Sequence, residues 1–167
     1  PQDTEAAAFF DVDNTLIQGS SLILLAQGLF KKRFITLSEL APALRKQIRY
    51  RVSGSENADD IAEGREQALA IVKGKSVEEL KQACREIVDN RMLQKSYADT
   101  IELASMHLAA GQQVWLVSAT PVQIGQALAE TLGFTGALGT VAEEEDGKFT
   151  GRLVGDILHG PGKKHAV

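Results

Sequence analysis

Residues 6–16 read Ala-Ala-Ala-Phe-Phe-Asp-Val-Asp-Asn-Thr-Leu, and this stretch decides the fold. The apolar run at 6–10 is short, and a polar loop follows it from Asp11 onwards. A short apolar run of this kind predicts a buried strand of a parallel sheet. Functional residues of such sheets lie at the carboxyl ends of the strands, and Asp11 occupies that position.

The composition limits the classes of protein that this chain can represent. With 167 residues, 44% of them hydrophobic, the chain suffices for one compact domain or for a domain with an insertion. The net charge of −4 argues against a surface built to bind nucleic acid or an anionic membrane. We therefore expect no nucleic-acid or membrane partner, and the sequence leaves the oligomeric state open.

The single cysteine, Cys84, excludes an internal disulfide and fits a reducing compartment. No signal peptide is visible, because the first residues are polar and acidic. The longest apolar run, at 22–30, is far shorter than the roughly 20 residues that a membrane-spanning helix needs. These features predict a soluble, cytoplasmic protein.

Residues 20–94 carry helical patterns and no convincing strand. Apolar residues at helical spacing predict helices at 20–34, 36–52 and 58–72. Ser76 and Glu79 form a capping box that predicts the start of a fourth helix. Four helices joined by short loops suggest a small helical bundle.

An α/β pattern resumes after this segment. A helix is predicted at 96–110, stopped by Gly111, and an apolar strand at 113–117 ends at Ser118. Thr120 offers an N-cap with Pro121 at the first helical position, and this next helix is predicted to end at Gly133.

The last part of the chain predicts a hairpin and one more helix. A short strand at 137–142 leads into an acidic turn at 143–147, and a second hairpin strand follows at 149–154. Residues 160–162 open a final helix. The order of elements predicts an α/β protein with a Rossmann-like parallel core at 1–18 and 95–167 and an inserted helical cap at 19–94.

The pair Asp11 and Asp13 suggests covalent catalysis of phosphoryl transfer. Two carboxylates two residues apart repel each other, and a hard cation such as Mg²⁺ offsets their charge. Asp11 can then attack phosphorus as a nucleophile, while Asp13 serves as general acid and then as general base. A calcium loop is excluded, since its sixth and twelfth positions hold Leu16 and Leu22. A merely solvated acidic loop is the remaining alternative.

Three segments resemble signatures of the haloacid dehalogenase (HAD) superfamily. Residues 9–16 resemble the first signature, which implies that Asp11 is the nucleophile and Asp13 the acid/base. The resemblance also implies that Asp11 and the backbone carbonyl of Asp13 bind Mg²⁺. Residues 114–118 resemble the second signature, which implies that the Ser118 hydroxyl binds the substrate phosphate. A helix-capping role for Ser118 is the alternative.

Residues 160–163 resemble the third signature, which implies that Lys163 neutralises the phosphate. Lys164 competes for this role, and a solvated lysine at the start of a helix is the alternative. The implied phosphate-binding set is Thr15, Ser118, Ala119 and Lys163. The superfamily's fourth signature, an acidic pair that completes the Mg²⁺ site, does not follow Lys163, so the core is expected to be incomplete at its C-terminal end.

The resemblance is strongest to subfamily IB, the phosphoserine-phosphatase-like branch with a helical cap after the first signature. Phosphoserine-specific members carry a glutamate where this chain has Ser20, and an arginine where it has Ala68, with Arg65 one turn upstream. A zwitterionic substrate needs both of its charges countered, and a neutral serine does not pair with an ammonium group. We therefore expect a substrate other than phosphoserine.

The sequence as a whole favours a Mg²⁺-dependent phosphomonoester hydrolase that acts on a small phosphorylated metabolite through an aspartyl-phosphate. One alternative is a non-catalytic HAD module that binds a phosphorylated ligand, or that is attached to a C-terminal partner domain such as an acyltransferase. Another is a phosphotransferase that uses the same intermediate.

Overall fold

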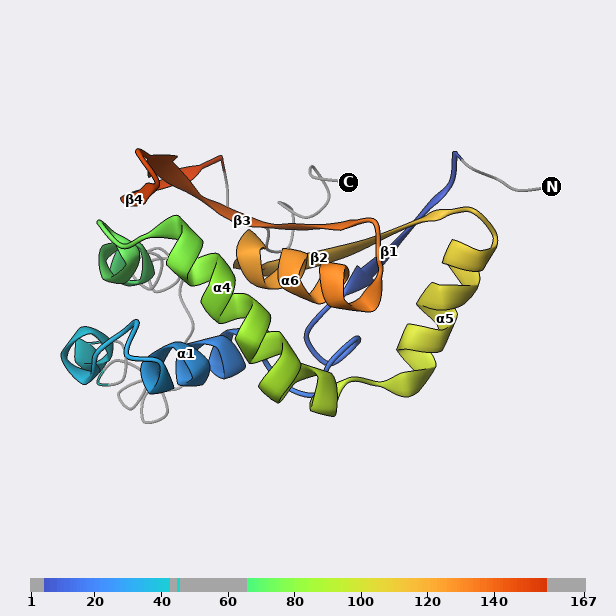
Figure 1. Cartoon of the computed structure of the whole chain (residues 1–167), viewed down its shortest axis with the longest axis horizontal. Coiled ribbons are helices and arrows are strands. Elements are labelled where there is room, and N and C mark those ends of the chain that lie inside the picture. The colour runs from blue at the N-terminus through green and yellow to red at the C-terminus, as the bar shows by residue number, and fades with distance from the viewer. Residues whose placement is uncertain (1–4, 43–44, 46–65, 156–167) are drawn as a thin grey trace.

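The structure is a computed structural model, and it describes residues 5–42, 45 and 66–155 (Figure 1). Within these ranges, none of the helices combines the length and the apolar character that crossing a bilayer requires. Residues 37–42 and 66–72 are also helical. In chain order, the named elements are β1 (Ala7–Asp11), α1 (Ser21–Lys31), α4 (Val77–Ile87), the π-helical turn η1 (Val88–Met92), the 3-10 turn η2 (Leu93–Lys95), α5 (Ala98–Ala109), β2 (Gln113–Pro121), α6 (Val122–Leu132), β3 (Gly136–Glu145) and β4 (Lys148–Val154).

The strands form one sheet in the order β1-β2-β3-β4. The first three strands run parallel, and β4 pairs antiparallel with β3. Helix α6 connects β2 to β3 and packs on both of them, as Figure 1 shows. A mostly parallel sheet covered by helices confirms the predicted α/β class.

The first strand differs from its prediction as a buried strand. In the sheet of the described residues β1 pairs with β2 on one side only, and its residues alternate between exposed and half-buried. The side chain of Phe9 is 43% exposed. A five-residue apolar run does not reveal whether one face or both faces of a strand are covered. The prediction that β1 is buried was wrong for this reason.

The helical segment and the sheet share one hydrophobic core. Leu16 and Ile17, just after β1, are fully buried in it together with Cys84 on α4. Burial raises the pKa of the Cys84 thiol to about 12, as expected of a packing residue rather than a reactive thiol. Helices α1 and α4 approach closely because Gly28 faces Ile87, where a β-carbon would lie 2.4 Å from Ile87 Cγ1.

The structure confirms two predicted helix ends, the start of α4 and the end of α6. The hydroxyl of Ser76 accepts a hydrogen bond from the Glu79 amide at 3.2 Å, which confirms the predicted start of α4. Gly133 ends α6 in the left-handed conformation, with φ of 73°. The predicted start of α6 was wrong: β2 continues through Pro121, the helix begins at Val122, and no side chain caps it.

The hairpin of β3 and β4 is confirmed, but its turn is shorter than predicted. Residues 143–145 belong to β3, and the loop consists of Asp146 and Gly147, with φ of 50° and 75°. Two central residues with positive φ are characteristic of the tight turn that matches the twist of a hairpin. Position 147 favours glycine for this reason.

The hairpin reaches the turn that precedes α4. The Gly74 amide donates to the Phe149 carbonyl at 2.8 Å, and the Phe149 amide donates to the Lys75 carbonyl at 3.1 Å. The Val77 amide donates to the Gly147 carbonyl at 3.0 Å. Figure 1 shows β4 lying beside this part of the chain. Backbone hydrogen bonds therefore join the hairpin to the helical segment.

The two connections between the sheet and the helical segment lie side by side. The Gln18 amide donates to the Lys95 carbonyl at 2.8 Å, and the Tyr97 amide donates to the Leu16 carbonyl at 2.9 Å. The chain therefore enters and leaves the helical segment at one place, as an inserted cap would require. The boundaries of the cap at 19 and 94 stay a prediction.

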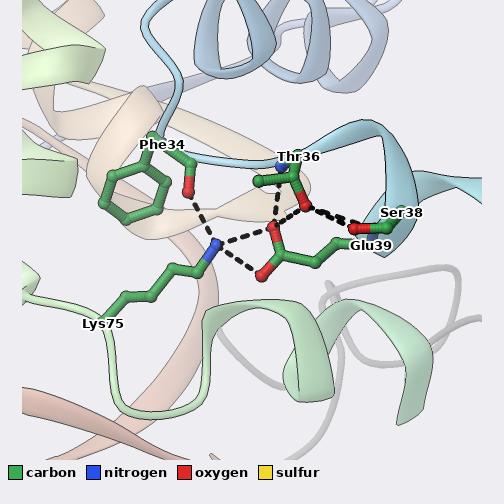
Figure 2. Close-up of polar contacts among 5 residues, drawn as sticks. All are labelled: Phe34, Thr36, Ser38, Glu39 and Lys75. Carbon is green, nitrogen blue, oxygen red and sulfur yellow. Dashed lines mark hydrogen bonds and ion pairs between the residues drawn. The ribbon is translucent and has the colours of Figure 1, made fainter.

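A polar cluster joins the segment after α1 to the turn before α4 (Figure 2). The carboxylate of Glu39 accepts from the Thr36 amide at 2.7 Å, and the Thr36 hydroxyl accepts from the Glu39 amide at 3.4 Å, which is a reciprocal capping box. Lys75 Nζ donates to the Phe34 carbonyl at 2.6 Å and pairs with Glu39 at 3.0 Å. The same ammonium lies 5.3 Å from the centre of the Phe34 ring.

This cluster predicts a pH-dependent effect of Glu39→Gln. Hydrogen bonds from Thr36, and then from Lys75, lower the pKa of Glu39 below 4.5. A lowered pKa in the folded state means that the carboxylate stabilises the fold above pH 4.5, and that this contribution is lost as the pH falls through the folded-state pKa. We expect the variant to lose about 1 kcal/mol of unfolding free energy at pH 7.

Urea unfolding at neutral and acidic pH measures this effect. The difference between wild type and Glu39→Gln should shrink towards zero as the pH is lowered below 4.5. Glu78→Gln is the matched control, because Glu78 is 76% exposed and lies 3.8 Å from Arg85. An equal loss of stability at both pH values would contradict the assigned role of the Glu39 charge.

Candidate active site

Strands β1 and β2 bring two predicted site residues close together near the carboxyl edge of the sheet. Asp11 is the last residue of β1 and is exposed, and it stands in register with Val117 of β2. Ser118 follows Val117 directly. Neighbouring strands lie about 4.8 Å apart, so the backbone positions of Asp11 and Ser118 are adjacent.

The loop after Asp11 is fixed by its own backbone. The Val12 carbonyl accepts hydrogen bonds from the Leu16 amide at 3.0 Å and from the Ile17 amide at 3.1 Å. Asn14 adopts a left-handed conformation with φ of 54°, and its side chain accepts from the Gly19 amide at 2.9 Å. Val12, Leu16 and Ile17 are also buried, so the loop is anchored in the hydrophobic core.

Asp13 is half-buried, and the start of α1 holds its carboxylate. Oδ1 accepts from the Ser21 amide at 3.0 Å and from the Ser21 hydroxyl at 2.6 Å. The preceding residue, Ser20, is the N-cap of α1, and its hydroxyl accepts from the Ile23 amide at 3.4 Å. We did not predict the contact with Ser21, although a pair of serines before an apolar helix is a helix-start signal.

Ser118 lies in a bulge of β2 rather than at the end of the strand. Its hydroxyl is buried, accepts from the Thr120 amide at 3.2 Å and shares a 2.8 Å hydrogen bond with the Thr120 hydroxyl. A serine oxygen can accept both of these bonds and still donate its own proton to a phosphate oxygen. The Ala119 carbonyl accepts from the Thr140 hydroxyl at 2.7 Å. Ser118 does not cap α6, so the capping alternative was wrong.

Gly139 makes room for this bulge. Val117 pairs with Leu138 and Pro121 with Thr140, so three residues of β2 stand opposite Gly139 alone. A β-carbon on Gly139 would lie 2.6 Å from Val122 Cα and 3.0 Å from the Thr120 carbonyl oxygen. The sequence did not identify Gly139 as part of the site, because nothing local shows which backbone crosses it.

Thr15 lines a surface pocket away from Asp11 and Ser118. Its carbonyl accepts from the Thr100 hydroxyl at 2.7 Å, and Asn14 and the 97–100 segment line the same pocket. Neither Asp11 nor Ser118 is among the described residues that line it. The predicted contact of Thr15 with phosphate stays a prediction.

The structure does not describe the basic residues considered above for phosphate and substrate binding, which are Lys163, Lys164 and Arg65. Ala68 is exposed. In the described ranges, no group of three or more His, Cys, Asp or Glu side chains is placed to hold a metal ion. The assignment of Asp11 and Asp13 as metal ligands therefore rests on sequence alone.

Comparison with known proteins defines the family. Residues 8–167 match the model of the haloacid dehalogenase-like hydrolases, and the chain belongs to this family. A phosphoserine phosphatase of Mycobacterium tuberculosis is 52% identical over 167 residues, which are 100% of this chain and 54% of that protein. The chain thus spans about half the length of this relative.

The chain is also similar to a second named phosphatase and to a solved structure. A histidinol-phosphatase of Neisseria meningitidis is 29% identical over 149 residues, covering 89% of this chain and 66% of that protein. The crystal structure of a protein of unknown function from Bordetella pertussis Tohama I is similar with a TM-score of 0.77 and 25% identity, over 96% of this chain and 70% of that one. The names of the two phosphatases therefore point to different substrates.

Proposed function

We propose that the protein is a Mg²⁺-dependent phosphomonoester hydrolase that forms an aspartyl-phosphate on Asp11. The observation that carries this proposal is the register that sets Asp11 beside Val117 and Ser118 at the carboxyl edge of the sheet. A carboxylate nucleophile at the end of β1 and a hydroxyl donor in the neighbouring bulge of β2 suit the attack on a phosphate held between them. Membership of the hydrolase family and the phosphatase names of the relatives support it.

The donor set of the described residues is compatible with Mg²⁺. Asp11 and the backbone carbonyl of Asp13 would hold the ion through oxygen atoms, which are the ligands that it prefers. Mg²⁺ keeps several waters and commonly takes one or two carboxylates plus substrate phosphate, so a full protein cage is not required. When bound, the ion neutralises part of the phosphate charge that would repel Asp11.

The side chains then perform two displacements. A carboxylate oxygen of Asp11 attacks phosphorus, the bond from phosphorus to the ester oxygen breaks, and Asp13 gives its proton to that leaving oxygen. A water oxygen next attacks the phosphorus of the aspartyl-phosphate while Asp13 takes the water proton. The bond to Asp11 breaks, which releases inorganic phosphate and restores both carboxyl groups.

The substrate that we propose is a small phosphorylated metabolite other than phosphoserine. The hydroxyl of Ser20 already accepts from the Ile23 amide as the cap of α1, and a neutral hydroxyl does not counter an ammonium charge. The similarity to a phosphoserine phosphatase makes phosphoserine the first compound to compare. Residues 19–94 would form the cap that excludes water from the site.

Metal dependence and trapping of the intermediate test the proposed function. With the full-length protein and 4-nitrophenyl phosphate, we expect phosphate release that EDTA stops and added Mg²⁺ restores. Acid quenching during turnover should leave a phosphoryl group, removable by hydroxylamine, on the peptide that contains Asp11. Turnover that survives EDTA, or a phosphoryl group on another residue, would refute the proposal.

A further inference from the structure

The carboxylate of Asp13 is held in an asymmetric way. Both hydrogen bonds from Ser21 end on Oδ1, one from the amide at 3.0 Å and one from the hydroxyl at 2.6 Å. Among the described residues no further hydrogen bond is made to Asp13, so none ends on Oδ2. No buried side-chain oxygen in the described part of the chain lacks a partner, so Oδ2 is open to solvent.

Ser21 is well suited to hold this group. It is the first residue of α1 and is 0% exposed, so its hydroxyl is shielded from competing water. A short hydrogen bond from a hydroxyl to a carboxylate is among the stronger hydrogen bonds in proteins. The Ser21 amide lies at the N-terminus of α1, where the helix dipole favours a negative charge such as the Asp13 carboxylate.

Capping of α1 accounts for the bond from the Ser21 amide but not for the bond from its hydroxyl. Ser20 already serves as the N-cap of α1 through its hydroxyl, so the helix has its own cap without Asp13. The bond from Ser21 instead crosses eight residues to a loop that lies against the end of β1. Ser21 thus links the first turn of α1 to the carboxylate beside the candidate nucleophile.

We propose that Ser21 is a positioning residue: it fixes Oδ1 of Asp13 so that Oδ2 carries the proton to the leaving oxygen. This inference rests on the proposed phosphatase function. The orientation of a general acid matters most when the leaving oxygen is strongly basic, because such a group departs slowly without a proton. A weakly basic leaving group departs with little help.

Two aryl phosphates separate these cases in the full-length protein. Phenyl phosphate has the more basic leaving oxygen, and 4-nitrophenyl phosphate the less basic one. For Ser21→Ala we expect kcat/KM to fall about tenfold for phenyl phosphate and to stay within about twofold for 4-nitrophenyl phosphate. The specificity constant is the correct readout because it covers the steps up to departure of the phenol.

Ser76→Ala is the matched control, since Ser76 caps α4 and does not contact Asp13. It should lower the melting temperature and leave the ratio of the two specificity constants unchanged. An equal loss for both substrates in Ser21→Ala, or no loss for either, would overturn the positioning role. Asp11→Asn in the same assay separates the two proposals, because its full activity would refute the phosphatase mechanism itself.

Discussion

Asp11→Asn is expected to lower turnover of 4-nitrophenyl phosphate by about 10⁴-fold or more, as loss of a nucleophile does in other enzymes that use covalent catalysis. The asparagine amide keeps the size of the side chain but offers a neutral oxygen that does not attack phosphorus. Asp11 is the exposed last residue of β1, so the substitution should leave the fold intact. Phosphate release by the full-length protein measures the effect, with circular dichroism as a check of folding.

Asp89→Asn is the matched control for this experiment. Asp89 is an exposed acid in η1, outside the candidate site, and its replacement removes the same charge. Turnover by this variant should stay within about twofold of wild type. If Asp11→Asn were as active as Asp89→Asn, the aspartyl-phosphate mechanism would be excluded.

Gly139→Ala is expected to damage both the site and the fold. A β-carbon would lie 2.6 Å from Val122 Cα and 2.8 Å from the Val122 amide nitrogen, and backbone atoms do not yield as a flexible side chain does. The bulge that carries Ser118 would have to move away from β3. A displacement of about 1 Å at such a position can cost about 10²-fold in rate, and the overpacking about 2 kcal/mol of stability.

Gly136→Ala provides the comparison on the same strand. A β-carbon there would meet the Trp115 ring at 2.6 Å, but this half-exposed side chain can turn away. We expect Gly136→Ala to keep near-normal turnover, whereas Gly139→Ala loses it. Chemical unfolding and kcat/KM with 4-nitrophenyl phosphate measure the two effects. Equal activity of the two variants would show that the bulge does not position Ser118.

The predictions that succeeded depended on local signals. Ser76 with Glu79 marks a helix start, Gly133 marks a helix end, and Asp146 with Gly147 forms a tight turn, each through interactions within a few residues. The parallel sheet also followed from the order of the elements. Local chemistry of this kind is visible without knowledge of the fold.

The failures arose where distant segments decide the structure. Pro121 is favoured in the first turn of a helix, but here it is the last residue of β2, after the bulge opposite Gly139. The exposure of Phe9 depends on which segments pack against β1, and the five residues of this strand do not show which segments these are. The contact between Ser21 and Asp13 requires the loop to fold back on the helix.

At the candidate site, the sequence pointed to Asp11 and Ser118 but not to the residues that support them. Asp11 follows a recognisable apolar strand and Ser118 a recognisable apolar run, and the register places Asp11 beside Val117 and next to Ser118. Ser21 and Gly139 act through neighbours that are close only in three dimensions. The phosphate contacts of Thr15, Ala119 and Lys163 and the metal-ligand assignments of Asp11 and Asp13 stay predictions.

Because Gly74 and Val77 are bonded to the hairpin, a rotation of α4 would carry the tip of β3 and β4 with it. The pairing of β3 with β4 shifts register between Ala142 and Glu144. Just before this point, the Thr140 hydroxyl is bonded to the Ala119 carbonyl, next to Ser118. Hydrogen bonds therefore connect the start of α4, through the β3–β4 hairpin, to the bulge that carries Ser118.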